Sequence, residues 1–238
     1  MPVVFLHGFT QTRQSWRRTI AALGGRYRAV APDLPGHGQA AERRPASFSA
    51  CAAYVRALAD EPIVLVGYSM GGRIALHTAL ALPGLVHRLV LVGASPGIAD
   101  AAEREERRLA DAALADRIES IGIEAFAQEW GAQELFAGQD ARVAAAAHAD
   151  RLRNTPHGLA AALRGLGTGV MPPLWDRLGE LAMPVGLVVG ERDAKFRAIA
   201  GRMAPAIPDC RVDVVDGAGH AAQLEQPEIV AAAIRGTP

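Results

Sequence analysis

The 238-residue sequence predicts an α/β fold in which helices flank a mostly parallel sheet. Short, nearly continuous apolar runs alternate with segments of helical spacing, which is typical of parallel strands covered on both faces. One stretch of about 90 residues, from Gly97 to Met183, contains no convincing strand, and its amphipathic segments predict an inserted helical lid. The chain is long enough to bury a large core as a single compact unit.

The same patterns place the elements in chain order. Strands are expected over 3–6, 28–31, 63–66, 89–92, 185–189 and 212–215. Helices are expected over roughly 14–24, 48–60, 70–82, 195–205 and 226–235. Residues 1–96 and 184–238 therefore form the predicted core, and residues 97–183 form the predicted lid. The lid should cover the carboxyl ends of the strands, where ligands bind in open parallel sheets.

Composition argues against several classes of function. The 25 basic and 25 acidic side chains cancel, so no overall field recruits nucleic acid or an anionic membrane. Apolar runs are too short to span a membrane, and the N-terminal residues predict a strand and not a signal peptide. Cys51 and Cys210 lack metal-ligand spacing and are expected to be free thiols, which suits the cytoplasm. Because the net charge is zero, an anionic ligand would have to be recognised by a local group of basic side chains.

The most informative stretch is Gly67-Tyr68-Ser69-Met70-Gly71, which separates a predicted strand from a predicted helix. A Gly-x-Ser-x-Gly motif in this setting predicts a nucleophile elbow, a tight turn that holds the serine hydroxyl above the sheet at a helix N-terminus. The loop after the first strand, His7-Gly8-Phe9, lies at the same edge. Backbone amides of Phe9 and Met70 could therefore form an oxyanion hole.

A serine hydroxyl needs an imidazole to take its proton, and the imidazole needs a carboxylate to fix its tautomer. Asp193 directly follows the fifth strand and His220 follows the sixth, so Ser69, Asp193 and His220 are the predicted catalytic residues. Their chain order is that of the α/β-hydrolase triad. Weaker candidates for the acid are Asp209, Asp213 and Asp216. Solvent exposure accounts more simply for His77, His87, His148 and His157, and loop architecture for His7 and His37.

Arg73 is unusual because it lies one helical turn past Ser69, near the N-terminus of the predicted helix. A cation there is disfavoured by the helix dipole by about 0.3–1 kcal/mol, so a negative group should compensate. Two interpretations remain open: a structural ion pair with a lid or loop carboxylate, or bidentate binding of a substrate carboxylate. Tyr68 could supply a further donor beside the serine.

Several motifs together resemble one family. These are Gly-Tyr-Ser-Met-Gly-Gly-Arg at the elbow, Leu-His-Gly-Phe-Thr near the start with Ser15-Trp16, Gly-Glu-Arg-Asp-Ala-Lys-Phe after the fifth strand, and Ala-Gly-His near the end. The chain resembles the MenH family of menaquinone biosynthesis, the 2-succinyl-6-hydroxy-2,4-cyclohexadiene-1-carboxylate synthases. The resemblance covers nearly the whole chain and implies the α/β-hydrolase fold. Because the chain begins at the strand leading into His7, the outermost N-terminal strands of larger hydrolases are expected to be absent.

The resemblance implies a lyase that removes a proton from a cyclohexene polycarboxylate and expels pyruvate, without a cofactor or a metal. Three arginines of that family would correspond here to Arg73, Arg107 and Arg153, with Trp130 as a lid aromatic over the substrate. Arg104 and Arg108 compete with Arg107, and Arg151 competes with Arg153. The expected partner is a small molecule, and the expected assembly is a monomer or small homo-oligomer. A carboxylesterase or a carbon–carbon bond hydrolase is the alternative.

Overall fold

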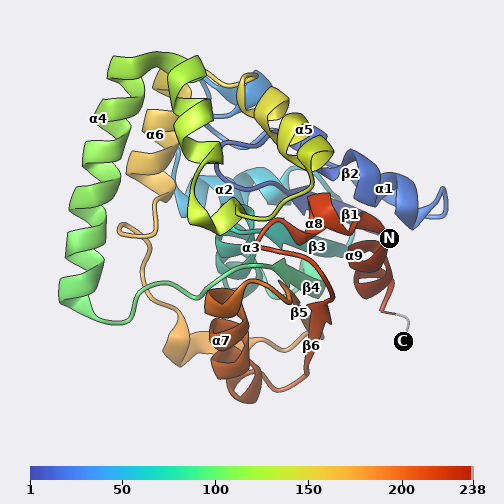
Figure 1. Cartoon of the computed structure of the whole chain (residues 1–238). Helices are drawn as coiled ribbons and strands as arrows, with labels where there is room; N and C mark the ends of the chain where they lie inside the picture. Colours follow the sequence, from blue (N-terminus) through green and yellow to red (C-terminus); the bar gives the residue numbers. More distant parts are fainter. Residues whose placement is uncertain (237–238) are drawn as a thin grey trace.

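The computed structural model describes residues 1–236, which contain one six-stranded, fully parallel sheet (Figure 1). The strand order is β2-β1-β3-β4-β5-β6, so the two central strands, β3 and β4, have neighbours on both sides. The strands are β1 (Pro2–Leu6), β2 (Arg28–Val30), β3 (Ile63–Tyr68), β4 (Val86–Val92), β5 (Val185–Gly190) and β6 (Cys210–Val215). The predicted α/β class is confirmed. Strand β4 begins earlier than expected because Val86 pairs with Ile63 before a register shift.

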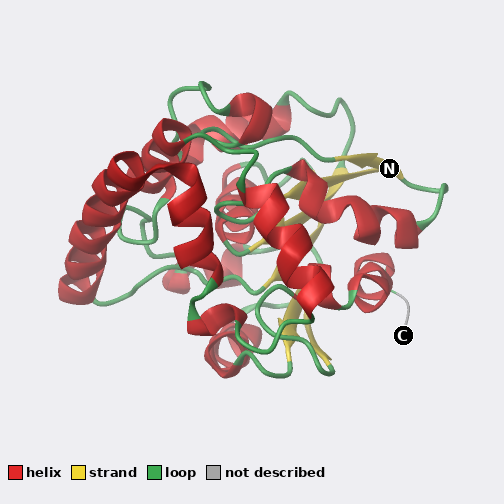
Figure 2. Ribbon diagram, turned by 45° about the horizontal axis from the view of Figure 1, so that its top comes forward, coloured by secondary structure: helices red, strands yellow, loops and turns green. Residues whose placement is uncertain are grey.

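Helices cover both faces of this sheet, as Figure 2 shows. The α-helices are α1 (Arg17–Leu23), α2 (Phe48–Arg56), α3 (Met70–Ala81), α4 (Ala101–Gly131), α5 (Ala141–Arg151), α6 (Pro156–Leu166), α7 (Ala194–Met203), α8 (Ala222–Glu225) and α9 (Pro227–Arg235). Short 3-10 helices lie at η1 (Arg13–Trp16), η2 (Gly38–Ala40), η3 (Glu134–Phe136), η4 (Trp175–Glu180) and η5 (Ala204–Ala206). The first expected helix is thus divided into η1 and α1, because Thr12 caps a 3-10 turn at its start.

Two apolar layers hold the sheet between these helices. On one face, side chains of α2, α3 and α7, such as Val55, Ile74 and Met203, pack against the strands. On the other face, Trp16 and residues of α1 and α9 do the same, with α1 lying against α9. No helix among residues 1–236 is both long enough and apolar enough to span a membrane.

All regular secondary structure between β4 and β5 is helical. Helix α4 breaks at Gly122, whose φ of 81° and ψ of 173° are not helical. The two parts of α4 pack with α6 around a small core that includes Ile118, Phe126 and Leu159. In Figure 1, α4 and α6 lie at the left of the molecule and α5 lies at the upper right, whereas α7 lies at the bottom. These helices border the edge of the sheet at which β3 ends.

Candidate active site

Ser69 occupies the sharp turn between β3 and α3. Its φ of 50° and ψ of −109° are sparsely populated for a residue with a side chain, and the first turn of α3 begins where Arg73 N–H donates to Ser69 O over 3.0 Å. Glycines on either side allow the turn. A Cβ at Gly67 would collide with the carbonyl of Gly71, and one at Gly71 would collide with the carbonyl of Leu6. The predicted elbow is therefore present as a backbone structure.

His220 lies between Ser69 and Asp193. Its Nδ1 donates to Oδ2 of Asp193 over 2.6 Å, which leaves Nε2 to accept the Ser69 hydroxyl, 3.2 Å away. Both His220 and Asp193 are buried. Asp193 also accepts the N–H of Phe196 and so caps α7. The structure thus brings the three predicted catalytic residues together, whereas the alternative acid Asp213 pairs with Arg211 instead.

A cavity of about 400 Å³ opens beside Ser69 and His220. Phe9 and Met70, the predicted oxyanion-hole residues, line it together with residues of α3, α4, α6 and α7. Trp130 of α4 forms part of the wall, with its ring 5.2 Å from that of Phe9. The Nε1 of Trp130 makes no hydrogen bond within residues 1–236. The cavity therefore combines the serine hydroxyl with an aromatic wall.

Arg73 lines the same cavity and has no carboxylate partner among the described residues. Its Nη1 donates to the carbonyl oxygen of Leu166 over 2.9 Å. Burial, together with the charge of Arg107, lowers the pKa of Arg73 to about 10, although Asp111 acts in the opposite direction. The structure therefore offers no ion pair to compensate the charge of Arg73. Of the two interpretations, binding of a substrate carboxylate is favoured over a structural ion pair.

Arg107, and neither Arg104 nor Arg108, reaches the cavity. Its Nε donates to Oδ1 of the buried Asp111 over 2.7 Å. Arg104 instead donates to carbonyl oxygens before α4, and Arg108 pairs with Glu105 on the outer surface. The three candidates on this helix are thus separated by where their side chains point.

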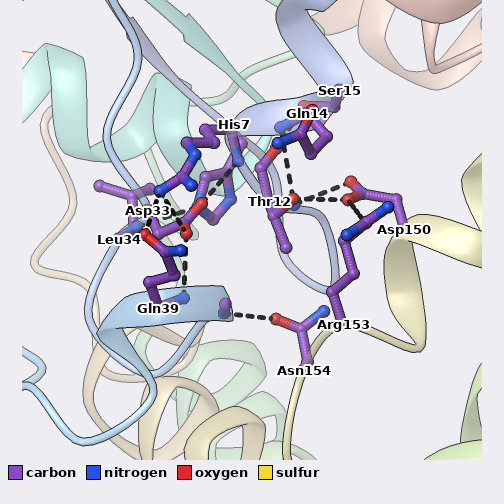
Figure 3. Close-up of polar contacts among 12 residues, drawn as sticks. His7, Thr12, Gln14, Ser15, Asp33, Leu34, Gln39, Asp150, Arg153 and Asn154 are labelled. Carbon is purple, nitrogen blue, oxygen red and sulfur yellow. Dashed lines mark hydrogen bonds and ion pairs between the residues drawn. The ribbon is translucent and has the colours of Figure 1, made fainter.

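Arg153 does not line the cavity, and Figure 3 shows its side chain beside Asp150. Helix α5 ends at Arg151, and the Nε of Arg153 lies 3.7 Å from Asp150 with 59% of its side chain exposed. Arg151 is buried, with its guanidinium 5.2 Å from the ring centroid of Phe136, and its Nε has no hydrogen-bond partner within residues 1–236. Phe136 in turn lies 6.4 Å from His220. Arg151 therefore packs on an aromatic ring that faces His220, although neither arginine lines the cavity.

Tyr68 supports the site from behind. Its side chain is buried against His220, with 5.2 Å between the ring centroids, and a Cβ at Gly8 would strike its ring. Burial raises the pKa of the Tyr68 phenol. Because Tyr68 does not line the cavity, direct contact with a substrate is not visible in this arrangement.

His7 and His37 tie the loops after β1 and β2 together, as predicted. His7 Nε2 accepts the N–H of Leu34 over 2.9 Å (Figure 3). Its Nδ1 donates to the carbonyl of Gly8. His37 Nε2 accepts the N–H of Thr10. Burial lowers the pKa of His7 to about 4 and that of His37 to about 3, so both are neutral near pH 7. They fix the loop that carries Phe9.

Sequence reasoning missed several residues that line the cavity, among them Asp111, Thr168, Lys195 and Phe196. Asp111 could have been found, because it lies one helical turn from Arg107. Phe196 packs on His220 with 4.5 Å between ring centroids, and its place three residues after Asp193 was the available signal. Within the described residues, no group of three or more His, Cys, Asp or Glu side chains is arranged to hold a metal ion.

Comparisons with known proteins agree on the fold and on a narrower group. The model described as "Alpha/beta hydrolase family" matches residues 3–233. A Bacillus subtilis protein provisionally named 2-succinyl-6-hydroxy-2,4-cyclohexadiene-1-carboxylate synthase is 38% identical, with 95% of this chain and 86% of the relative covered. A Salmonella typhimurium synthase of that name is 37% identical, with 94% of this chain and 88% of the relative covered.

Solved structures give the same result. The structure of MenH from S. aureus matches with a TM-score of 0.94 and 35% identity over 99% of this chain and 92% of that chain. A thermophilic esterase from Thermogutta terrifontis matches with a TM-score of 0.83 and 29% identity over 99% and 88%.

Proposed function

The chain belongs to the α/β-hydrolase family and, within it, to the 2-succinyl-6-hydroxy-2,4-cyclohexadiene-1-carboxylate synthases, and we propose that it catalyses the reaction for which they are named. The substrate is 2-succinyl-5-enolpyruvyl-6-hydroxy-3-cyclohexene-1-carboxylate. The enzyme removes a ring proton, and the released electron pair forms a new ring double bond. The existing ring double bond shifts by one position, and the bond from the ring to the enolpyruvyl oxygen breaks. The leaving enolpyruvate takes up a proton to become pyruvate.

The observation that carries this proposal is Arg73, a cavity-lining cation without a carboxylate partner in the described chain, beside a complete Ser69–His220–Asp193 arrangement. Arg107 adds a second cation to the same cavity. A substrate with three carboxylates needs such fixed cations, whereas a simple ester or lipid favours an apolar pocket. The polarity of the cavity therefore supports a polyanionic substrate.

Each residue has a proposed role. Asp193 fixes the tautomer of His220 and stabilises its charged form, so that His220, directly or through Ser69, accepts the ring proton. The backbone amides of Phe9 and Met70 stabilise the enolate-like charge that develops. Arg73 and Arg107 bind carboxylates, and we assign the third arginine to Arg151 and not to Arg153, since Arg151 is buried near Tyr68 with an unused Nε. Tyr68 supports the His220 ring, and Trp130 covers the substrate.

Residues 97–183 act in this proposal as a lid on a core formed by the remainder of the chain. A cytoplasmic location is proposed as well, because Cys51 and Cys210 are free and the substrate is a biosynthetic intermediate. Assembly as a monomer or small homo-oligomer remains our expectation.

The test is a steady-state assay of pyruvate release from the named substrate, with p-nitrophenyl acetate and butyrate as comparison substrates. We expect pyruvate release with a kcat/KM in the range of ordinary enzymes, about 10⁴ M⁻¹s⁻¹ or more. A carboxylesterase is the alternative, favoured by the similarity to the Thermogutta esterase and by a triad geometry that both reactions share. Rapid ester hydrolysis without pyruvate release would establish the alternative.

A further inference from the structure

Lys195 is the only lysine in the chain, and the other 24 basic side chains are arginines. Among the described residues, each surface ion pair formed by Arg or Lys is formed by an arginine. The chemistry of the two side chains differs, because the ammonium is a compact charge on a flexible stem whereas the guanidinium is a rigid planar fork. A position that keeps lysine therefore invites a specific explanation.

Lys195 lines the cavity that contains Ser69 and His220. It is the second residue of α7, immediately beyond the catalytic acid Asp193, and its side chain is exposed. Its Nζ lies 5.9 Å from the ring centroid of Phe196, the residue that packs on His220. Arg73 and Arg107 line this cavity from α3 and α4, whereas Lys195 lines it from α7.

The surroundings of Lys195 provide no counter-charge for it. No ion pair joins Lys195 to a carboxylate within residues 1–236. The carboxylate of Asp193, two residues earlier, is engaged by His220 and by the N–H of Phe196. The first turn of α7 contains no acidic residue, and a cation in that turn is disfavoured by the helix dipole. An anion in the cavity would remove this cost.

We propose that Lys195 binds a carboxylate of the substrate, distinct from the one held by Arg73. This inference rests on the proposed function and extends it, because it adds Lys195 to Arg73 and Arg107 as a cation that lines the cavity, beside the buried Arg151 proposed above, and gives a role to the only lysine. The flexible stem lets the ammonium follow a carboxylate that enters from solvent at the exposed side of the cavity. Lys195 is thereby a specificity-determining residue and takes no part in proton transfer.

The test compares pyruvate release by the wild-type enzyme, Lys195→Met and Lys195→Arg. Losing one charge-assisted hydrogen bond should raise KM by roughly tenfold in Lys195→Met and change kcat by less than about threefold. Lys195→Arg keeps the charge and should give a KM between that of the wild-type enzyme and that of Lys195→Met. Arg197→Met is the matched control, because Arg197 lies on the same helix, outside the cavity, and donates to the carbonyl of Glu191.

The outcomes separate the two claims. If the wild-type enzyme releases no pyruvate, the proposed function is wrong and this inference is wrong with it. If the wild-type enzyme releases pyruvate but Lys195→Met keeps the wild-type KM, only the role of Lys195 is overturned. An equal rise of KM in Lys195→Met and Arg197→Met would also overturn it, because the effect would then follow net charge and not the cavity.

Discussion

Arg107 and Asp111 form a 2.7 Å ion pair across one turn of α4, at the wall of the cavity. Asp111 is buried and also accepts the N–H of Gly169 over 3.2 Å, so its charge is fully engaged. Arg73, which lines the same cavity from α3, has no such partner within residues 1–236. The cavity therefore contains more positive than negative charge, and this excess is what a polycarboxylate would use.

Asp193→Asn tests the proposed role of Asp193 as the acid that orients His220. The asparagine amide would present a donor to Nδ1 of His220, which favours the wrong tautomer and removes the charge that stabilises the imidazolium. We expect kcat for pyruvate release to fall by roughly 10²–10⁴-fold with little change in KM. The folded state should persist, since the asparagine oxygen can still cap α7 through the N–H of Phe196. Unchanged kcat would exclude Asp193 as the acid.

The choice between Arg151 and Arg153 is tested by replacing each with methionine. Arg151 is buried beside Phe136 without a carboxylate partner in the described chain, whereas Arg153 is largely exposed beside Asp150. Arg151→Met should raise KM for the polycarboxylate by roughly tenfold or more, and Arg153→Met by less than about threefold. Steady-state pyruvate release measures both. The reverse ranking would restore Arg153 to the site.

Acid stability should depend on His37. Its pKa is lowered by burial to about 3 in the folded chain, against about 6.5 when unfolded. Between these values the unfolded state binds a proton that the folded state does not, so stability falls as pH drops below about 6.5, by up to about 1.4 kcal/mol per pH unit. His37→Gln should therefore flatten the fall of Tm between pH 7 and pH 5. His87→Gln, at an exposed position, serves as the control and should leave that slope unchanged.

Glu225 connects the loop of His220 with the start of α5. It accepts the N–H of Gly219 over 3.0 Å and pairs with Arg192 at 2.8 Å, while Arg192 also donates to the carbonyl of Gly138. Because its side chain is only 6% exposed, Glu225→Ala should lower the free energy of unfolding by about 1–3 kcal/mol and reduce kcat. Glu225→Gln keeps an acceptor for Gly219 and should be milder.

The control for this contact is Glu180→Gln, which breaks an exposed pair with Arg177 and should change stability by less than about 1 kcal/mol. Urea unfolding and pyruvate release, measured on all three variants, give the comparison. Equal effects in Glu225→Ala and Glu180→Gln would show that Glu225 contributes only as a surface charge.

The sequence predicts the sheet well because its strands are apolar runs bounded by loops. The polar residues of the site come directly after these strands in the sequence, as Asp193 comes after β5. The Gly67–Gly71 turn is equally local, since the glycines are required by contacts that any elbow makes. The arginines were harder. Whether Arg151 or Arg153 points inward depends on where α5 ends and on the Thr12–Asp150 contact, which joins residues 138 positions apart. The places of Asp111 and Lys195 in the site became evident only from the residues that line the cavity.

The most direct test of the central claim is the effect of Arg73→Met on two substrates. If Arg73 binds a substrate carboxylate, kcat/KM for pyruvate release from the polycarboxylate should fall by roughly 10²-fold or more, while any hydrolysis of neutral p-nitrophenyl acetate changes by less than about threefold. Arg104→Met, which removes a charge outside the cavity, is the control. Equal losses on both substrates, or retained pyruvate release in Arg73→Met, would contradict the account.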